Sequence, residues 1–158
     1  MIVKDCMTKD VITVKKSTSL SKLIEYFSKY NFHTLPVVEE GNRLVGVVTF
    51  EDIMKVFRPY NPQMIKMLET IPFVEKIEEE DILVSDISSE MGILVIVDDL
   101  IDTNFVAVHQ QASIKEARSL MKLHEAEILP VVENGVLVGV ITLFDIIISL
   151  FKQKGIVE

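Results

Sequence analysis

The sequence is poor in the residue types that support several common classes of protein. A single cysteine, Cys6, excludes an internal disulfide and suits a reducing compartment. Tryptophan is absent, and aromatic residues make up only 7% of the chain, so aromatic stacking surfaces are scarce. The 16 basic residues are outnumbered by 24 acidic ones, and the resulting net charge of −8 disfavours nonspecific binding to nucleic acid or to an anionic membrane.

Long uninterrupted apolar runs are also missing. The longest, residues 136–151, contains Gly139, Thr142 and Asp145 and is too short and too polar to span a bilayer. Residues 1–5 show no apolar secretory region. Together with the single cysteine, these features predict a cytoplasmic protein. The chain is nevertheless 49% hydrophobic with a mean hydropathy of +0.35, so it can bury a sizeable core.

The sequence does contain an internal repeat. Leu35–Glu39 recurs as Leu129–Glu133, and Leu44–Ile53 recurs as Leu137–Ile146. Two distant copies indicate a duplicated domain rather than a solenoid. The predicted organisation is a first repeat at 1–58, a connector with a short helix at 59–94, and a second repeat at 95–158.

Each repeat shows the pattern of strand, helix, two strands and helix, which predicts an α/β (α+β) fold with one small sheet and two helices per repeat. The elements expected in the first repeat are strands at 11–14, 34–39 and 44–48, a helix containing Leu20, Leu23, Ile24 and Phe27, and a helix ending near 58. Those of the second are strands at 105–108, 128–133 and 137–142, a helix after Ser113, and a helix at 143–152. In the connector, Asn61-Pro62 predicts a helix at 62–71.

A Thr-x-x-Asp pattern follows each core strand, as Thr49 with Asp52 and as Thr142 with Asp145. A threonine followed three residues later by an acid is typical of a helix N-terminal cap. The same helix end presents unpaired N–H groups and a positive dipole, which suit an anion such as phosphate. The pattern alone leaves both interpretations open, a structural cap and a nucleotide site.

No arrangement of catalytic residues accompanies these patterns. His33, His109 and His124 do not form a known metal-binding spacing with Cys, Asp or Glu. Cys6 stands alone, and no segment resembles a nucleophile elbow. The sequence therefore predicts a protein that is not an enzyme, with no catalytic residue and no metal site.

The duplicated unit, with its Gly-h-h-Thr-x-x-Asp pattern (h is apolar) and its lead-in Val3–Thr8, resembles the cystathionine-β-synthase (CBS) domain, which occurs in pairs called Bateman modules. The resemblance implies two pseudo-symmetric sheets and two clefts that bind AMP, ADP or ATP as regulatory ligands, with no required cofactor. It also implies a homodimer that transmits the state of the ligand to an effector protein. The alternatives are a ligand-free dimerisation scaffold and an S-adenosylmethionine binder.

The resemblance also assigns roles to residues. Asp52 and Asp145 would accept hydrogen bonds from ribose hydroxyls, and Thr49 and Thr142 would lie near ribose and phosphate. The family often carries basic residues just before Leu-Pro; His33 keeps part of that pattern. The remaining candidates are the adenine-flanking Thr8, Val11, Ile12, Phe105 and Val106, and Lys16 as a phosphate contact.

Charges at matched positions predict two unequal clefts. The matched pairs are Lys9 with Thr103, Thr8 with Asp102, Lys16 with Gln110 and His33 with Glu127, each less positive in the second repeat. Attraction of a phosphate is on the order of 1–4 kcal/mol per charge at about 4 Å. The cleft with Thr49 and Asp52 is therefore expected to prefer a phosphorylated adenosine, although spacing leaves open that side chains of the other repeat reach the phosphates.

Apolar helix surface predicts self-association. The residues expected to remain uncovered in one chain are Ile53, Val56, Phe57, Ile146, Ile147 and Leu150. Large exposed apolar patches are unusual in monomers, and helix faces of this kind commonly seal a homodimer in the family that the chain resembles. The expected partners are therefore a second copy, an adenine nucleotide and an effector protein, with no nucleic acid and no membrane.

Overall fold

The computed structural model describes residues 1–30, 33–56, 70, 72 and 90–158, and it divides into two compact units. The sheet unit consists of residues 1–16, 34–48 and 101–158. The helix unit consists of residues 17–33 and 49–100. The division cuts across the sequence repeats, because most strand residues of the first repeat belong to one unit and its helices to the other.

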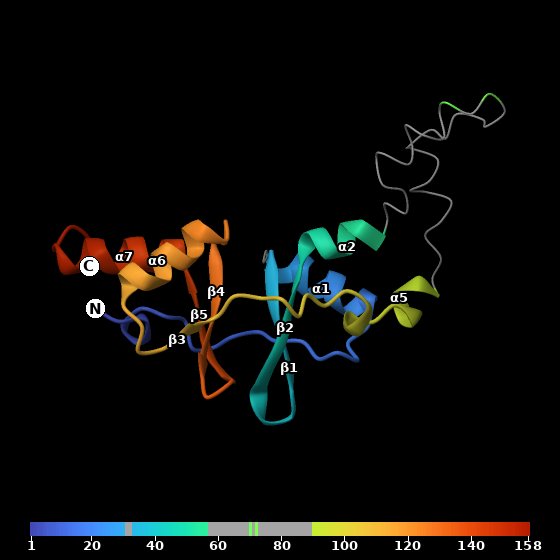
Figure 1. The fold of residues 1–158 in the computed structure, drawn as a ribbon, viewed down its shortest axis with the longest axis horizontal. Coiled ribbons are helices and arrows are strands. Elements are labelled where there is room, and N and C mark those ends of the chain that lie inside the picture. Colours follow the sequence, from blue (N-terminus) through green and yellow to red (C-terminus); the bar gives the residue numbers. More distant parts are fainter. Residues whose placement is uncertain (31–32, 57–69, 71, 73–89) are drawn as a thin grey trace. The chain divides into compact units, whose positions relative to one another are not determined.

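Five strands form a single sheet in the order β1-β2-β5-β4-β3. Their bounds are β1 Thr34–Glu39, β2 Arg43–Thr49, β3 Val108–His109, β4 Ile128–Glu133 and β5 Val136–Thr142. β4 and β5 form an antiparallel hairpin, and β3 is parallel to β4 (Figure 1). The mixed α/β fold is as predicted, but the sequence suggested two separate sheets. The hairpins instead join at the single pair Arg43 and Val136, where the Leu44 N–H also donates to the Gly135 carbonyl at 3.0 Å.

The first strand expected in each repeat is much shorter than predicted. In place of a strand at 11–14 there is one bridge, in which the Val14 N–H donates to the Pro36 carbonyl at 3.0 Å and the Val38 N–H donates to the Val14 carbonyl at 2.9 Å. β1 is an edge strand, which accommodates Pro36 because proline has no N–H for a ladder. The apolar pattern identified these positions but not their backbone pairing, which depends on the neighbouring strand.

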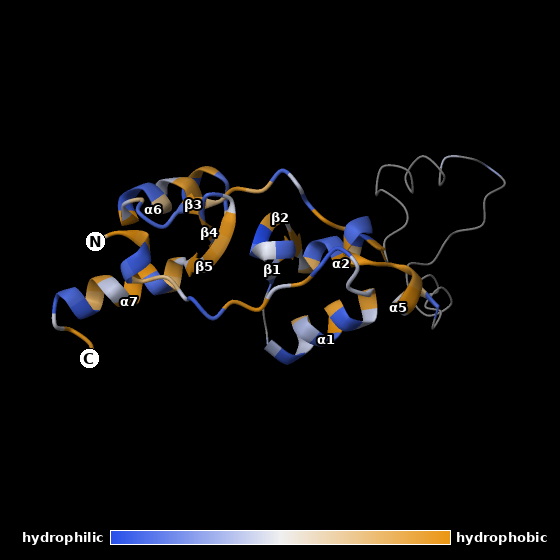
Figure 2. Ribbon diagram, turned by 90° about the horizontal axis from the view of Figure 1, so that it is seen from below, coloured by the Kyte–Doolittle hydropathy of each residue, from blue (hydrophilic) through white to orange (hydrophobic). Residues whose placement is uncertain are grey.

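Two helices complete the sheet unit, α6 Ile114–Leu123 and α7 Leu143–Gln153. The Ser113 hydroxyl accepts a hydrogen bond from the Glu116 N–H at 3.1 Å, as its cap position predicted. Ile114, Ala117 and Met121 are buried on the predicted face of α6 (Figure 2). The other buried members of this core are Val3, Val108, Leu129, Val131, Ile141 and Ile146.

The helix unit contains α1 Leu20–Tyr30, α2 Phe50–Val56 and the short α5 Met91–Leu94. Leu20, Leu23 and Phe27 are buried as predicted, whereas Ile24 is exposed. The Phe27 ring meets the Phe50 ring edge to face, with centroids 6.4 Å apart. The predicted helix at 62–71 and the predicted end of α2 near 58 lie outside the described residues.

The lead-in of each repeat pairs with the core strand of the other repeat, within the sheet unit. Thr8 and Val140 exchange two backbone hydrogen bonds, each of 2.9 Å. Asp102 and Val47 do the same, at 2.9 and 3.0 Å. Residues far apart in the sequence are thereby tied together by backbone groups alone, so the pairing does not depend on the identity of their side chains.

The glycine of each Gly-h-h-Thr-x-x-Asp pattern is required by this pairing. A Cβ on Gly139 would lie 2.7 Å from the carbonyl oxygen of Thr8, and a Cβ on Gly46 would lie 2.7 Å from that of Asp102. Both distances are shorter than a carbon and an oxygen tolerate without a backbone shift. Glycine therefore occurs here because another backbone segment approaches closely.

The apolar helix residues that remain exposed differ from those predicted. Ile53 and Ile146 are buried within their own units, because they face the cores, and Phe57 lies outside the described residues. The exposed apolar residues of α7 are Leu143, Phe144, Ile147 and Phe151. In the described parts of the chain, no helix combines the length and the apolar composition needed to cross a membrane.

Replacing Gly139 with alanine should destabilise the fold by about 1–3 kcal/mol, because the added methyl group meets backbone that cannot rotate away. Urea denaturation of the full chain measures this loss. Gly92→Ala is the matched control, since its Cβ would lie 3.3 Å from Ser21 Cβ and 3.8 Å from Ser21 Oγ, both of them side-chain atoms, and the helix of α5 favours alanine. Equal losses in the two variants would contradict the close approach at Gly139.

Candidate functional site

The Thr-x-x-Asp pattern of the second repeat forms a reciprocal cap in the sheet unit. β5 ends at Thr142 and α7 begins at Leu143. Asp145 Oδ2 accepts hydrogen bonds from the Thr142 N–H at 2.8 Å and from its hydroxyl at 2.7 Å. Thr142 Oγ1 in turn accepts from the Asp145 N–H at 3.0 Å. The interpretation of the pattern as a helix cap is therefore confirmed. In this cap the Asp145 carboxylate is half-buried at the N-terminus of α7.

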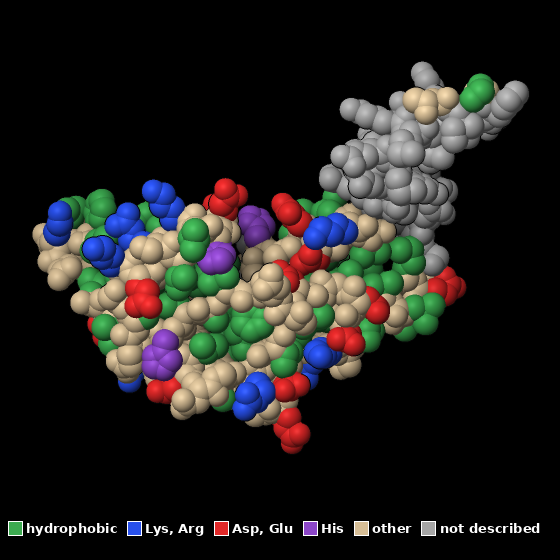
Figure 3. All heavy atoms as spheres, viewed as in Figure 1, with side chains coloured by type: hydrophobic (Ala, Val, Ile, Leu, Met, Phe, Trp, Pro, Cys, Tyr) green, Lys and Arg blue, Asp and Glu red, His purple; other side chains and the backbone are tan. Residues whose placement is uncertain are grey.

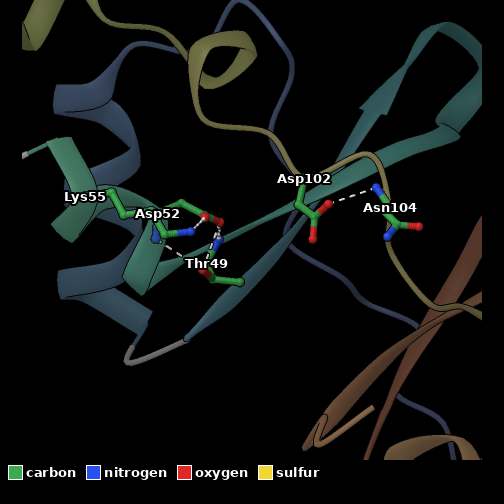
Figure 4. Close-up of polar contacts among 5 residues, drawn as sticks. All are labelled: Thr49, Asp52, Lys55, Asp102 and Asn104. Carbon is green, nitrogen blue, oxygen red and sulfur yellow. Dashed lines mark hydrogen bonds and ion pairs between the residues drawn. The ribbon is translucent and has the colours of Figure 1, made fainter. Parts of the chain in front are cut away.

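The first repeat forms the same cap in the helix unit, with one addition. Asp52 Oδ2 accepts from the Thr49 N–H and hydroxyl, both at 2.8 Å, and Thr49 Oγ1 lies 3.3 Å from the Asp52 N–H (Figure 4). Lys55 Nζ lies 3.1 Å from Asp52 Oδ1, with its side chain 74% exposed. Both carboxylate oxygens are thus engaged. The Thr-x-x-Asp motif does not include Lys55, although the spacing of three residues between Asp52 and Lys55 on a helix predicts such a pair.

Asp145 has no such partner. The residue at the position matched to Lys55 is Ile148, which cannot form an ion pair. Within the described ranges, Asp145 Oδ1 makes no hydrogen bond or ion pair. A free carboxylate oxygen can accept a hydrogen bond from a ligand hydroxyl without first displacing a cation. The two caps are therefore alike in backbone geometry and different in the availability of their carboxylates.

The residue just before each Thr-Leu-Pro or Ile-Leu-Pro segment lies beside the cap. His33 accepts a backbone hydrogen bond from the Phe50 N–H at 2.9 Å, and Glu127 accepts the equivalent bond from Leu143 at 3.0 Å. Both side chains are exposed. The structure thus brings His33 to the first residue of α2 and an acidic residue to the matched position by α7.

Cys6 lies close to the cap of the second repeat. Its thiol is within 3.7 Å of the Ile2 carbonyl and 3.6 Å of the Val3 carbonyl. Burial raises the pKa of the Cys6 thiol; Asp145 and Asp5 act in the same direction, while a hydrogen bond with Ser149 opposes them. The upward shift of the Cys6 pKa disfavours the thiolate, which is the nucleophilic form.

Two of the predicted adenine-flanking residues lie near this cap. Thr8 pairs with Val140, two residues before Thr142 on β5. Val106 packs against the core cluster that contains Ile141 and Ile146. Thr8 was expected to flank the adenine, and its backbone pairs with the core strand of the other repeat. Spacing within a repeat could not reveal this, because the pairing partner lies far along the chain.

The remaining residues predicted to contact the ligand from the strand and lead-in segments are Val11, Phe105, Ile12 and Lys16. Val11 and Phe105 pack against an apolar cluster whose buried members are Val38, Leu44 and Leu137. Leu137 lies near the start of β5, about 16 Å along the strand from Thr142. Ile12 is half-buried and Lys16 is exposed. Val11 and Phe105 therefore contact the apolar cluster that contains Leu137.

Asp102 uses its side chain locally. Its Oδ1 accepts a hydrogen bond from the Asn104 N–H at 2.8 Å, which closes an Asx turn (Figure 4). Across the described ranges, no group of three or more His, Cys, Asp or Glu side chains is arranged to hold a metal ion. The acidic residue that matches Thr8 in the second repeat is therefore accounted for by the conformation of its own loop.

The chain matches known proteins over both repeats. The family model of the CBS domain matches residues 3–59 and 97–152. Inosine-5'-monophosphate dehydrogenase from Methanocaldococcus jannaschii is 40% identical over 53 residues, which are 34% of this chain and only 11% of the enzyme. The chain therefore corresponds to a small part of that relative.

Solved structures share the fold over nearly the whole chain. CBSX2 from Arabidopsis thaliana, solved in complex with AMP, has a TM-score of 0.69 and 22% identity, covering 97% of this chain and 98% of the other. The CBS domain pair of MJ0100, solved with 5'-methylthioadenosine and S-adenosyl-L-methionine, has a TM-score of 0.66 and 22% identity, covering 98% of both chains. Because the family model also matches both repeats, this chain belongs to the CBS domain family and carries two copies of that domain.

Proposed function

We propose that the chain is a cytoplasmic regulatory CBS pair that binds AMP, ADP or ATP at its Thr-Asp caps and passes the state of the ligand to a partner. The observation that carries the proposal is the cap of Thr142 and Asp145, which holds a half-buried carboxylate with one unpaired oxygen at a helix N-terminus. The complexes of CBSX2 with AMP and of MJ0100 with two adenosine derivatives support the ligand class.

The chemistry of the cap suits an adenosine ligand. Asp145 Oδ2 is held by Thr142, so the carboxylate is fixed in orientation while Oδ1 can accept from a ribose hydroxyl. The dipole of α7 is positive at this end and favours a nearby phosphate. The negative charge of Glu127 repels a phosphate at close range. Hydrogen bonding to the ribose therefore contributes more to binding at this cap than attraction of the phosphate does.

Each lead-in pairs with the core strand of the other repeat, so its charged residues lie beside that strand and not beside the strand of its own repeat. Thr8 and Lys9 accompany β5, whereas Asp102 and Thr103 accompany β2. The more positive lead-in therefore belongs with the strand that ends in the second cap. On this basis, and because Asp145 is unpaired, we propose the cap of the second repeat as the stronger ribose site.

The alternative function is a ligand-free scaffold that acts only by association. It is favoured by the fact that each aspartate already has a structural role as a helix cap. An S-adenosylmethionine site is the other alternative, since its sulfonium would be attracted to the acidic side chain of Glu127. Thermal shift against AMP, ADP, ATP and S-adenosylmethionine separates these functions, because a ligand that binds only the native state raises its stability.

Replacing Asp145 with alanine should weaken binding of AMP or ATP roughly ten- to a hundredfold, because the ribose loses a charged acceptor. The loss of the cap should also cost about 1 kcal/mol of stability. Calorimetric titration and urea denaturation measure the two effects. Asp5→Ala is the matched control, since it removes a carboxylate that accepts from the Ile2 N–H in the same unit. A loss of stability with unchanged affinity in Asp145→Ala would favour the scaffold.

Replacing Lys55 with glutamine should release Asp52 Oδ1 and tighten ligand binding at the first cap by about two- to fivefold, the range expected for an exposed ion pair. Titration in an Asp145→Ala background isolates that cap. Lys22→Gln is the control, because it breaks the comparable 2.9 Å pair with Glu25 on α1. Weaker binding in Lys55→Gln would instead mean that the lysine contacts the ligand phosphate.

A further inference from the structure

Three of the backbone N–H groups at the start of α7 are already used within the chain. The Thr142 N–H donates to Asp145 Oδ2 at 2.8 Å, and the Asp145 N–H donates to Thr142 Oγ1 at 3.0 Å. The Leu143 N–H donates to the Glu127 carbonyl at 3.0 Å. A helix N-terminus binds a phosphate through N–H groups of this kind. This cap therefore offers a phosphate few backbone donors, and the charges of nearby side chains become more important.

The cap of the first repeat has the same backbone arrangement. The Thr49 N–H donates to Asp52 Oδ2, and the Phe50 N–H donates to the His33 carbonyl. Backbone donors therefore do not distinguish the two caps. The side chains do, because the residue that accepts the bond from the first helical N–H is His33 at one cap and Glu127 at the other.

Glu127 lies close enough to its cap to act on a ligand there. Its carbonyl oxygen is 3.0 Å from the Leu143 nitrogen, so its Cα lies within about 6 Å of that nitrogen. The side chain is exposed, and within the described ranges its carboxylate forms no ion pair. The screening length at about 0.1 M salt is about 10 Å. The charge of Glu127 therefore reaches ligand groups at the start of α7.

The other charges near this cap do not compensate for Glu127. In the segments 8–10, 122–127 and 142–145, carboxylates outnumber Lys and Arg by two; the residues are Asp10, Glu125, Glu127 and Asp145 against Lys9 and Lys122. Lys152 is the basic residue of α7, and it lies about 15 Å along the helix from Thr142. In Figure 3 an acidic side chain lies where α6 leads into β4, whereas Lys and Arg side chains gather farther along α6 and α7. The surroundings of the cap are therefore negative.

The ligands proposed for this cap differ chiefly in negative charge. A phosphate monoester such as AMP carries about −1.5 to −2 near neutral pH, and ADP and ATP carry more. A ribose held by Asp145 keeps its 5′ substituent near the same helix end, so each added phosphate increases the repulsion from Glu127. We propose that Glu127 is a specificity-determining residue, which makes the cap of the second repeat prefer AMP to ADP and ATP. This inference rests on the proposed function, because it concerns the ligand of that same cap.

Calorimetric titration of the full chain carrying Asp52→Ala measures the cap of the second repeat, because the variant removes the ribose acceptor of the first. The buffer contains no Mg²⁺, since Mg²⁺ binds phosphates and would mask their charge. At about 50 mM salt, ATP should bind about tenfold more weakly than AMP, with ADP between them. The difference should narrow at about 500 mM salt, because salt screens exposed charges.

Glu127→Gln in the same background should narrow the ratio of the ATP and AMP dissociation constants about two- to fivefold, the range expected for an exposed charge pair. Glu127→Lys should narrow it further, because repulsion becomes attraction. The matched control is Glu133→Gln, which removes an exposed carboxylate about 20 Å away at the other end of β4 and should leave the ratio unchanged. Unchanged melting curves verify that each variant folds.

The reciprocal variant His33→Glu places a carboxylate at the matched position of the first cap. Titration in an Asp145→Ala background isolates that cap. The ratio of the ATP and AMP dissociation constants should rise about two- to fivefold over that of the background, because the new charge lies beside the first residue of α2.

Three results would overturn the role of Glu127 and leave the proposed function intact. They are ATP binding at least as tightly as AMP in the Asp52→Ala background, equal effects of Glu127→Gln and Glu133→Gln on the ratio, and an unchanged ratio in His33→Glu. Failure of AMP, ADP and ATP alike to bind the unmodified chain would overturn the proposed function, and the role of Glu127 with it.

Discussion

The arrangement of the sheet unit depends on one constraint, the pairing of each lead-in with the core strand of the opposite repeat. The bonds between Thr8 and Val140 and between Asp102 and Val47 are backbone hydrogen bonds, so they are formed by groups that every residue type except proline carries. Only Gly46 and Gly139 allow the approach, because a Cβ would meet a carbonyl oxygen at each. The two repeats are thereby tied together within one sheet unit, and the lead-in beside the strand that ends in the second cap comes from the first repeat.

The caps combine a structural role with the recognition proposed for them. In each, a threonine and an aspartate satisfy backbone and side-chain groups where a strand turns into a helix. The difference between them is a single ion pair, since Lys55 engages Asp52 while Ile148 leaves Asp145 with a free oxygen. A duplicated motif thus yields two sites of unequal chemistry through a residue outside the motif.

α7 carries apolar residues on both its buried side and its exposed side. Ile146 is in the core, whereas Ile147 and Phe144 remain uncovered. Apolar surface that one chain leaves exposed is normally covered by another molecule.

The sequence by itself determined the duplicated fold class, the helix faces and the reciprocal caps, because periodicity and capping are local properties of consecutive residues. It could not determine that Thr8 lies beside β5, that the two hairpins share one sheet, or that the strand at 11–14 is reduced to one bridge. Those features depend on which distant segments meet, and glycines such as Gly46 and Gly139 permit a close approach without identifying the segment that approaches. Only the tertiary structure decided that the lead-in of the first repeat lies beside β5, the strand that ends in the second cap.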